Sequence, residues 1–381
     1  MALLNVSAMS FGALSANAIK ALNKGAQMGH FAHDTGEGGL TKYHLEFGGD
    51  VVWGIGSGYF GARTKDGKFD PEMFAQKAAH ESVQMVSLKL SQGAKPGIGG
   101  VLSAGKVGAE IAEARNVPQG EKYVSPPSHS VSTPRELIQF IGKMRELVGG
   151  KPAGFKLCVG SRTEVLAICR AIIEEGVMPD FIIVDGSEGG TGAAPLEYED
   201  HVGTPLTEGL MTIHNALVGC GLRNQIKVGA AGKVATGSDI VKRLIQGADY
   251  TNAARAMMMA TGCLQLQRCQ TNQCPVGVAT QDPKRAMALD VVDKSQRVRN
   301  FQSATVSEAM QIMASMGVRE PHELSPDMRR RRVDHTTTGS YSELFEWLRR
   351  AELLAEAPQS WARDWELADP DSFRVQHFAV R

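Results

Sequence analysis

Three cysteines lie close together in the second half of the chain. Cys263, Cys269 and Cys274 follow C-x5-C-x4-C spacing and make up half of the six cysteines in the sequence. Thiolates spaced in this way on an irregular loop are soft ligands that can hold a small iron–sulfur cluster. The C-x2-C spacing that is common in ferredoxins and zinc sites is absent. The alternative is that the three cysteines are small apolar core residues beside a Met-rich helix, and the spacing alone leaves both interpretations open.

A lysine inside an apolar segment is the second candidate for chemistry. Lys156 lies within AGFKLCV, residues 153–159, which is typical of a buried strand. A buried ammonium without a partner is costly, so a carboxylate or an electron-rich ring edge is expected beside it. The alternative, a lysine that points to an outer helix layer, is less compatible with an apolar parallel strand.

The elements that must position these groups alternate between strands and helices. Helix signals include Ser15 as an N-cap and Thr133-Pro134-Arg135-Glu136 as a capping box. The near-continuous apolar character of the later strands is typical of a parallel sheet. Eight strands are predicted, at residues 3–8, 30–34, 51–56, 83–90, 153–159, 180–184, 226–230 and 249–253.

Eight strand–helix units predict an α/β fold, a (β/α)8 TIM barrel over residues 1–320 that includes the cysteine loop 263–274. An open doubly wound sheet is the runner-up, but no G-x-G-x-x-G follows the first strand. Residues 321–381 are predicted to form a C-terminal helical tail, with one amphipathic helix at 341–355. This tail is expected to pack on the barrel or on a neighbouring subunit.

Two turns of small residues follow the seventh and eighth predicted strands, where barrels of this type commonly bind phosphate. They are AAGK at 230–233 and NAAR at 252–255, and the second ends in Arg255. Backbone amides in such turns can approach a phosphate closely, and a guanidinium binds it with two hydrogen bonds. A phosphate-bearing cofactor is therefore predicted. The long connection at 91–132, with one predicted helix at 107–114, is interpreted as the substrate-side loop.

Composition excludes several classes of function. Lys plus Arg (41) equals Asp plus Glu (41), so net charge favours neither nucleic acid nor an acidic membrane surface. Six cysteines, no secretory signal and no membrane-spanning apolar run predict a reducing, cytoplasmic setting. The chain begins abruptly in its first predicted strand, so further upstream sequence is expected and would alter this localisation if it carried a signal.

Five motifs follow one another along the chain. They are SAMSFGALS at 7–15, TGEGG at 35–39, QGAKPG at 92–97, GGTGA at 189–193, and the segment from Cys263 to Cys274 followed by PVGVATQ. Together they resemble the FMN-binding synthase domain of glutamate synthase, and most closely its stand-alone FMN-binding branch. They occur in that family's order and cover about residues 3–320.

The resemblance implies roles for individual residues. The three cysteines would bind a 3Fe-4S cluster, with 4Fe-4S as the alternative, and FMN would lie over the barrel mouth. Lys156 would approach the N1/O2 edge of the flavin, where an ammonium stabilises negative charge on the ring. The other cofactor-binding positions would be Ser10, Phe11, Gly12, Gln92, Gly189, Gly190, Thr191, Gly232, Ala253, Ala254 and Arg255, and the catalytic positions Glu37, Lys95 and Arg115.

The implied activity is that of an oxidoreductase of glutamate biosynthesis, which reduces 2-iminoglutarate, formed from 2-oxoglutarate and ammonia, to glutamate. Ile98 and Val101 stand where the larger enzymes have Glu and Gln, so a different oxo or amino acid is a second hypothesis. A third is an electron-transfer or scaffold subunit without its own turnover. Expected partners are an electron donor such as ferredoxin or an NAD(P)H-oxidising subunit, and a separate amidotransferase. We also expect a homo-oligomer and no nucleic acid.

Overall fold

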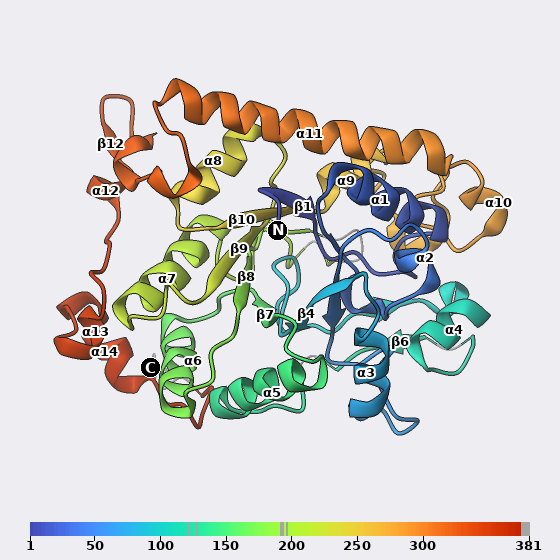
Figure 1. Ribbon diagram of the computed structural model, residues 1–381, viewed down its shortest axis with the longest axis horizontal. Helices are drawn as coiled ribbons and strands as arrows, with labels where there is room; N and C mark the ends of the chain where they lie inside the picture. The colour runs from blue at the N-terminus through green and yellow to red at the C-terminus, as the bar shows by residue number, and fades with distance from the viewer. Residues whose placement is uncertain (121, 127–128, 191–193, 196, 375–381) are drawn as a thin grey trace.

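Eight strands pair in parallel and close on themselves in the order β1-β10-β9-β8-β7-β4-β3-β2 (Figure 1). The computed structural model describes residues 1–120, 122–126, 129–190, 194–195 and 197–374. Each barrel strand overlaps one of the eight predicted segments, so the (β/α)8 barrel is confirmed. The barrel strands are β1 (Leu4–Val6), β2 (His33–Asp34), β3 (Val51–Ile55), β4 (Val83–Lys89), β7 (Ala153–Leu157), β8 (Phe181–Asp185), β9 (Lys227–Ala231) and β10 (Tyr250–Ala253).

The interior of the barrel is apolar at the bottom and charged at the top. Phe181, Ile183, Ala231 and Tyr250 form a small buried cluster within it. Because side chains alternate along a strand, Asp185 lies on the same face of β8 as Phe181 and Ile183. Charged groups therefore lie above an apolar floor, at the carboxyl ends of the strands.

Helices form the outer layer, and their caps follow the sequence signals. The Ser15 side chain accepts a hydrogen bond from the Ala18 amide, and Thr133 accepts one from Glu136. The carboxylate of Glu136 bonds Ser132. The helices of this layer are α1 (Ala16–Gly29), α2 (Lys42–Leu45), α3 (Pro71–Ala78), α5 (Pro134–Leu147), α6 (Arg162–Glu175), α7 (Leu206–Gly219), α8 (Gly237–Ile245) and α9 (Arg255–Ala260).

The long helix α11 (Val291–Ser315) crosses the outside of α1 and α8 (Figure 1). Gly25 allows this close approach, since a Cβ atom there would lie 2.7 Å from Val298 Cγ1. The short helix α10 (Pro283–Ala286) precedes it. α11 thereby covers the barrel beside the cysteine loop.

The connection between β4 and β7 contains more structure than the sequence predicts. The helix α4 (Ala109–Arg115) is close to the predicted 107–114. A two-stranded antiparallel ribbon also forms from β5 (Val101–Leu102) and β6 (Tyr123–Val124). This ribbon brings together the two ends of the segment 103–122, which contains α4.

The tail is less helical than predicted, since it also contains two paired strands. The single helix predicted at 341–355 is wrong, because α12 (Tyr341–Leu344) ends at Phe345, whose backbone is extended. Asn215 on α7 donates a hydrogen bond to the Glu346 carbonyl and accepts one from the Leu348 amide, so α7 takes up the polar backbone groups of this extended segment. The remaining tail elements are β11 (Arg330–Arg332), β12 (Thr338–Ser340), α13 (Glu352–Ala355) and α14 (Gln359–Leu367).

No helix within the described ranges combines the length and apolar character needed to cross a membrane.

Candidate active site at the carboxyl end of the barrel

Glu37 is the centre of a group of charged side chains above the strands. It lies in the 3-10 turn η1 (Gly36–Gly38), after β2. Its Oε1 atom accepts a hydrogen bond from Lys89 Nζ at 2.8 Å, and Lys95 and Arg115 also interact with its charge. The structure therefore brings together the three residues predicted to be catalytic, Glu37, Lys95 and Arg115, although their roles remain predictions.

The cations determine the protonation state of Glu37. Burial alone would raise the pKa of Glu37, but Lys89, Arg115 and Lys95 outweigh burial and lower that pKa. Burial lowers the pKa of Lys95, and lowers that of Arg115 to about 10, while Glu37 opposes both changes. With three cations around one carboxylate, this end of the barrel attracts anionic ligands.

A concave pocket lies beside this group. Glu37, Lys89 and Gln92 line one part of it, and Ile98 lines another. Val101, the other departure noted in the sequence, is 42% exposed and lies on β5. The described residues that line the pocket are Glu37, Ser57, Lys89, Leu90, Ser91, Gln92, Gly97, Ile98, Gly99, Gly100 and Pro126.

Lys156 lies inside the barrel and has the carboxylate partner that the sequence predicts. Its Nζ lies 3.2 Å from Asp185 Oδ2, which also accepts a hydrogen bond from the Gly93 amide at 3.0 Å. Burial would lower the pKa of Lys156, but Asp185 and Asp34 outweigh it and raise that pKa. Lys156 is therefore charged at neutral pH, next to the segment that begins with Gln92.

The first loop of the barrel contacts Arg115, one of the cations around Glu37. Ser10, Phe11 and Gly12 follow β1, and the Phe11 carbonyl accepts a hydrogen bond from Arg115 Nη2 at 3.1 Å. Gly12 has φ +104°, and a Cβ atom at this position would lie 3.0 Å from the same nitrogen. Gly12 therefore permits the approach of Arg115 in a way that other residues would strain.

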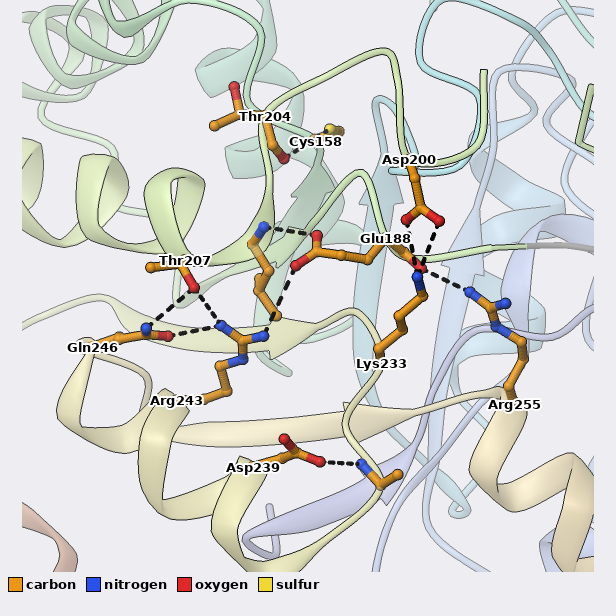
Figure 2. A network of polar contacts seen from close by, with 12 residues as sticks. Cys158, Glu188, Asp200, Thr204, Thr207, Lys233, Asp239, Arg243, Gln246 and Arg255 are labelled. Atoms are coloured by element: carbon orange, nitrogen blue, oxygen red, sulfur yellow. Dashed lines mark hydrogen bonds and ion pairs between the residues drawn. The ribbon is translucent and has the colours of Figure 1, made fainter. Parts of the chain in front are cut away.

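Two cations and several carboxylates surround the predicted phosphate turns (Figure 2). Arg255 Nη1 lies 3.1 Å from Glu199, and Arg255 Nη2 donates to the Glu188 carbonyl. Lys233 pairs with Asp200 at 3.0 Å. The cations expected at a phosphate are thus present, each with a carboxylate partner on the segment before α7.

Glycines shape these turns. Gly232 has φ +139°, and Ala253 is buried at the end of β10, with Ala254 next to it. A Cβ atom at Gly190 would lie 2.6 Å from Arg255 Nη2, so the guanidinium lies directly against this glycine. The Gly189 amide donates to the Gly186 carbonyl. Thr191, also predicted here, lies outside the described residues.

A polar network that the sequence does not reveal fixes the loop after β8 (Figure 2). Arg243 on α8 donates to Thr207 at 3.0 Å and to Gln246 at 2.8 Å, and its Nη2 lies 3.9 Å from Glu188. Glu188 also accepts a hydrogen bond from the Leu206 amide. The glycine-rich loop is therefore attached to the start of α7 and, through Arg243, to the last turn of α8.

The three predicted ligand cysteines lie on one loop and are half-buried and free, whereas Cys158, Cys169 and Cys220 are buried. Among the described residues, no three His, Cys, Asp or Glu side chains are arranged to hold a metal ion. The thiols nevertheless interact: burial and then Cys263 raise the pKa of Cys269, and Lys106 lowers it.

The backbone of this loop turns repeatedly between the cysteines. The Gln265 amide donates to Cys263 Sγ at 3.4 Å. Gln265, Gln267 and Asn272 have left-handed backbone angles. The three thiols are donors of the type that binds an iron–sulfur cluster, but all three also pack against the hydrophobic core, so the structure does not decide between the two interpretations.

Sequence reasoning missed three charged residues of this end of the barrel. Lys89, Asp34 and Asp185 are the last residues of β4, β2 and β8. Lys89 lies in register with Lys156 on the neighbouring strand. A charged residue that ends an apolar strand is the signal that would have identified them.

Comparisons with known proteins agree with this arrangement. Residues 2–319 match the family described as "Conserved region in glutamate synthase". The glutamate synthase large subunit-like protein YerD of Bacillus subtilis is 41% identical over 327 residues, which are 85% of this chain and 62% of YerD. An archaeal glutamate synthase [NADPH] of Methanocaldococcus jannaschii is 33% identical over 81% of this chain and 58% of its own length.

The chain thus spans about three fifths of the length of these relatives. Among solved structures, a mutant flavocytochrome b2 with pyruvate bound superposes with a TM-score of 0.53 at 15% identity, over 86% of this chain and 68% of that one. At this identity the likeness concerns the barrel fold alone. The match over residues 2–319 and the relatives at 33–41% identity show that the chain belongs to the glutamate synthase family.

Proposed function

We propose that this protein is an FMN- and iron–sulfur-dependent oxidoreductase that reduces an imino acid, formed from 2-oxoglutarate and ammonia, to glutamate. The observation that carries the proposal is the group of Lys89, Lys95 and Arg115 around Glu37, beside the buried pair of Lys156 and Asp185. The overall change is 2-oxoglutarate + NH4⁺ + 2 e⁻ + 2 H⁺ → glutamate + H2O. Family membership supports this type of reaction.

The cations around Glu37 suit a dicarboxylate. Lys89 lines the pocket, and Lys95 and Arg115 act on the same glutamate, so this group offers cations for the two carboxylates of 2-oxoglutarate. Arg115 presents a planar fork suited to a carboxylate, and Lys95 a point charge. Glu37, held by Lys89, is placed to exchange a proton with a nitrogen of the bound substrate.

The residues present fit FMN. Arg255 and Lys233 supply cations for its phosphate, and Gly190 and Gly232 leave space at the two turns. Asn252 Oδ1 is buried without a hydrogen-bond partner among the described residues, so it is free to accept one from a ring N–H. When bound, FMN would supply hydride transfer, and Lys156 would hold its pyrimidine side. We propose the cysteine loop as the site of a 3Fe-4S cluster, through which electrons reach the barrel.

Electron donor and nitrogen source belong to the same proposal. Relatives are named for NADPH and for ferredoxin, which supports a donor of one of these two types. We propose that ammonia comes from a separate amidotransferase. Six free cysteines support a reducing compartment.

A different substrate is the second candidate, favoured by one observation. Ile98, an apolar residue, lines the pocket beside Glu37 and Lys89. Ile98 cannot form a hydrogen bond with a polar group of 2-oxoglutarate, and a buried polar group without a partner weakens binding. A subunit that only transfers electrons is the third candidate.

One experiment separates these candidates. The photoreduced protein is mixed anaerobically with ammonia and each of a panel of 2-oxo acids, and reoxidation of the flavin is followed by absorbance. Reoxidation fastest with 2-oxoglutarate supports the proposal, and a preference for a monocarboxylate supports the second candidate. Absence of reoxidation with every acid, with unchanged 2-oxoglutarate affinity in Lys95→Ala and Arg115→Ala, would support the third.

A further inference from the structure

Asp34, the last residue of β2, is a buried carboxylate to which neither sequence nor family comparison assigns a role. It is 4% exposed and lies inside the barrel mouth. Its Oδ1 accepts a hydrogen bond from the Gly36 amide at 2.9 Å and would lie 3.2 Å from a Cβ at Gly54. The side chain is thus held between the turn that follows its own strand and Gly54 on the neighbouring strand β3.

The charges that face Asp34 come from four other strands and one turn. Lys156 on β7, Lys89 on β4 and Asp185 on β8 interact with its charge, and Asp34 in turn affects Tyr250 on β10. Glu37 in η1 joins the group through Lys89 and Lys156. The charged groups around Asp34 therefore lie at the carboxyl end of the barrel, whereas Tyr250 is the first residue of β10.

Asp34 is the carboxylate of this group that has no ion-pair partner. Lys89 and Lys156 both interact with its charge, but each is paired with another carboxylate. Lys89 pairs with Glu37 at 2.8 Å and Lys156 with Asp185 at 3.2 Å, while Lys95 and Arg115 act on Glu37. No Lys or Arg nitrogen in the described part of the chain lies within ion-pair distance of Asp34. A buried carboxylate without a paired cation is costly when charged, so Asp34 is the most favourable place in the group for a proton.

The electrostatics of Asp34 agree with its lack of a paired cation. Burial raises the pKa of Asp34 to about 6, although Lys156 and the Gly36 amide act in the opposite direction. Glu37, in contrast, has a lowered pKa because Lys89 holds it as a carboxylate. Of these two, only Asp34 has a pKa close to neutral.

We infer that Asp34 holds the exchangeable proton of this charged group. Asp34 takes the proton from water when negative charge is added beside Lys156 and releases it when that charge leaves. The inference rests on the proposed function, because the added charge is that of an electron pair delivered by the external donor to the bound cofactor. The only bond that forms on Asp34 is O–H, and the proton returns to water on reoxidation. Asp34 is thus a positioning residue that acts through Lys156.

The first test needs no cofactor. Unfolding of the apo protein is measured at pH 5 and pH 7 for wild type, Asp34→Asn and the matched control Asp50→Asn, an exposed position just before β3. A carboxyl with a raised pKa favours the folded state at low pH, and this contribution is lost as pH rises through about 6. From pH 5 to pH 7 the folding constant of the wild type should fall about tenfold more than that of Asp34→Asn. The Asp50→Asn variant should behave like the wild type. Parallel pH curves for wild type and Asp34→Asn would overturn the inference.

The second test measures reduction of the FMN-loaded protein at equilibrium against a redox dye from pH 6.5 to 7.5. The wild-type reduction constant should change about 100-fold per pH unit, for two protons, and that of Asp34→Asn about tenfold, for one. If both proteins bind FMN and their reduction constants depend equally on pH, the inference about Asp34 is overturned and the proposed function is not. If the wild type does not bind FMN, the proposed function is overturned, and the unfolding test of Asp34 remains valid. If Asp34→Asn does not fold, the wild-type reduced-minus-oxidised infrared spectrum decides: a new protonated-carboxyl band supports the inference, and its absence overturns it.

Discussion

Lys89 Nζ lies 2.8 Å from Glu37 Oε1, and each of the two side chains is only 16% exposed. The lysine ends β4, while the glutamate lies in the turn after β2, so the barrel itself sets their distance. Both residues line the adjoining pocket, so a carboxylate of the proposed substrate would share Lys89 with Glu37. Under this proposal, Lys89 links substrate binding to the charge of Glu37.

Replacement of this lysine should weaken substrate binding. In Lys89→Met we expect the Kd for 2-oxoglutarate to rise roughly 10- to 100-fold, because a hydrogen bond to a charged group contributes about 1.5–3 kcal/mol. Calorimetric titration of the FMN-loaded protein measures this. Lys68→Met is the matched control, since Lys68 forms an exposed pair with Asp66 outside the pocket. An unchanged Kd in Lys89→Met would show that the pocket is not the substrate site.

The cysteine loop makes a prediction about iron. Cys274→Ser should lose most of its iron and acid-labile sulfide after anaerobic purification, because a serine hydroxyl is a poor ligand for the cluster. Cys169→Ala, which removes a buried thiol from α6, should keep both. Equal iron contents in the two variants would contradict the assignment of the loop.

His33 predicts how stability depends on acid. Both ring nitrogens are buried without hydrogen-bond partners in the described part of the chain, and burial lowers the pKa of His33 to about 3. The folded state therefore keeps the ring neutral, and this contribution to stability is lost as pH falls below about 6.5. At pH 5.5 the cost is roughly 1.4 kcal/mol for this residue.

His33→Gln should remove that part of the acid sensitivity, whatever its cost at pH 7.5. Urea unfolding at pH 7.5 and 5.5 measures the difference between the two values in each protein. His30→Gln is the control, because His30 is exposed. A wild-type and a His33→Gln protein that lose the same stability on acidification would contradict this account of His33.

Asn215 should determine whether the tail stays docked. It makes two hydrogen bonds of 2.9 Å to the backbone of the segment after α12. Asn215→Ala should cost about 1–3 kcal/mol and make the bonds around residues 345–351 more susceptible to limited proteolysis. Asn215→Asp, which keeps only the acceptor, should be intermediate. If Asn215→Ala is cleaved no faster than wild type, other contacts hold the tail.

The barrel was predictable because local signals and the global fold agree. Apolar runs such as DFIIV at 180–184 are long enough to specify buried parallel strands, and Ser15 and Thr133 mark helix starts by their own hydrogen bonds. The position of Lys156 inside the barrel could be predicted, because a charged side chain within an apolar parallel strand has few other places to point.

The rest depends on contacts between distant parts of the chain. The helix pattern at 341–355 is amphipathic, yet Asn215, more than 100 residues away, binds the segment in extended form. The pairing of Glu37 with Lys89, and of Asp185 with Lys156, arises only when the strands close into a barrel. No local pattern contains this information.

The anaerobic visible spectrum of the FMN-loaded protein during titration with 2-oxoglutarate tests the central claim most directly. We predict flavin absorbance whose bands shift and saturate as the dicarboxylate binds beside Lys89, Lys95 and Arg115, with a weaker response to a monocarboxylate. A protein that retains no flavin, or a flavin spectrum that 2-oxoglutarate leaves unchanged, would contradict the account.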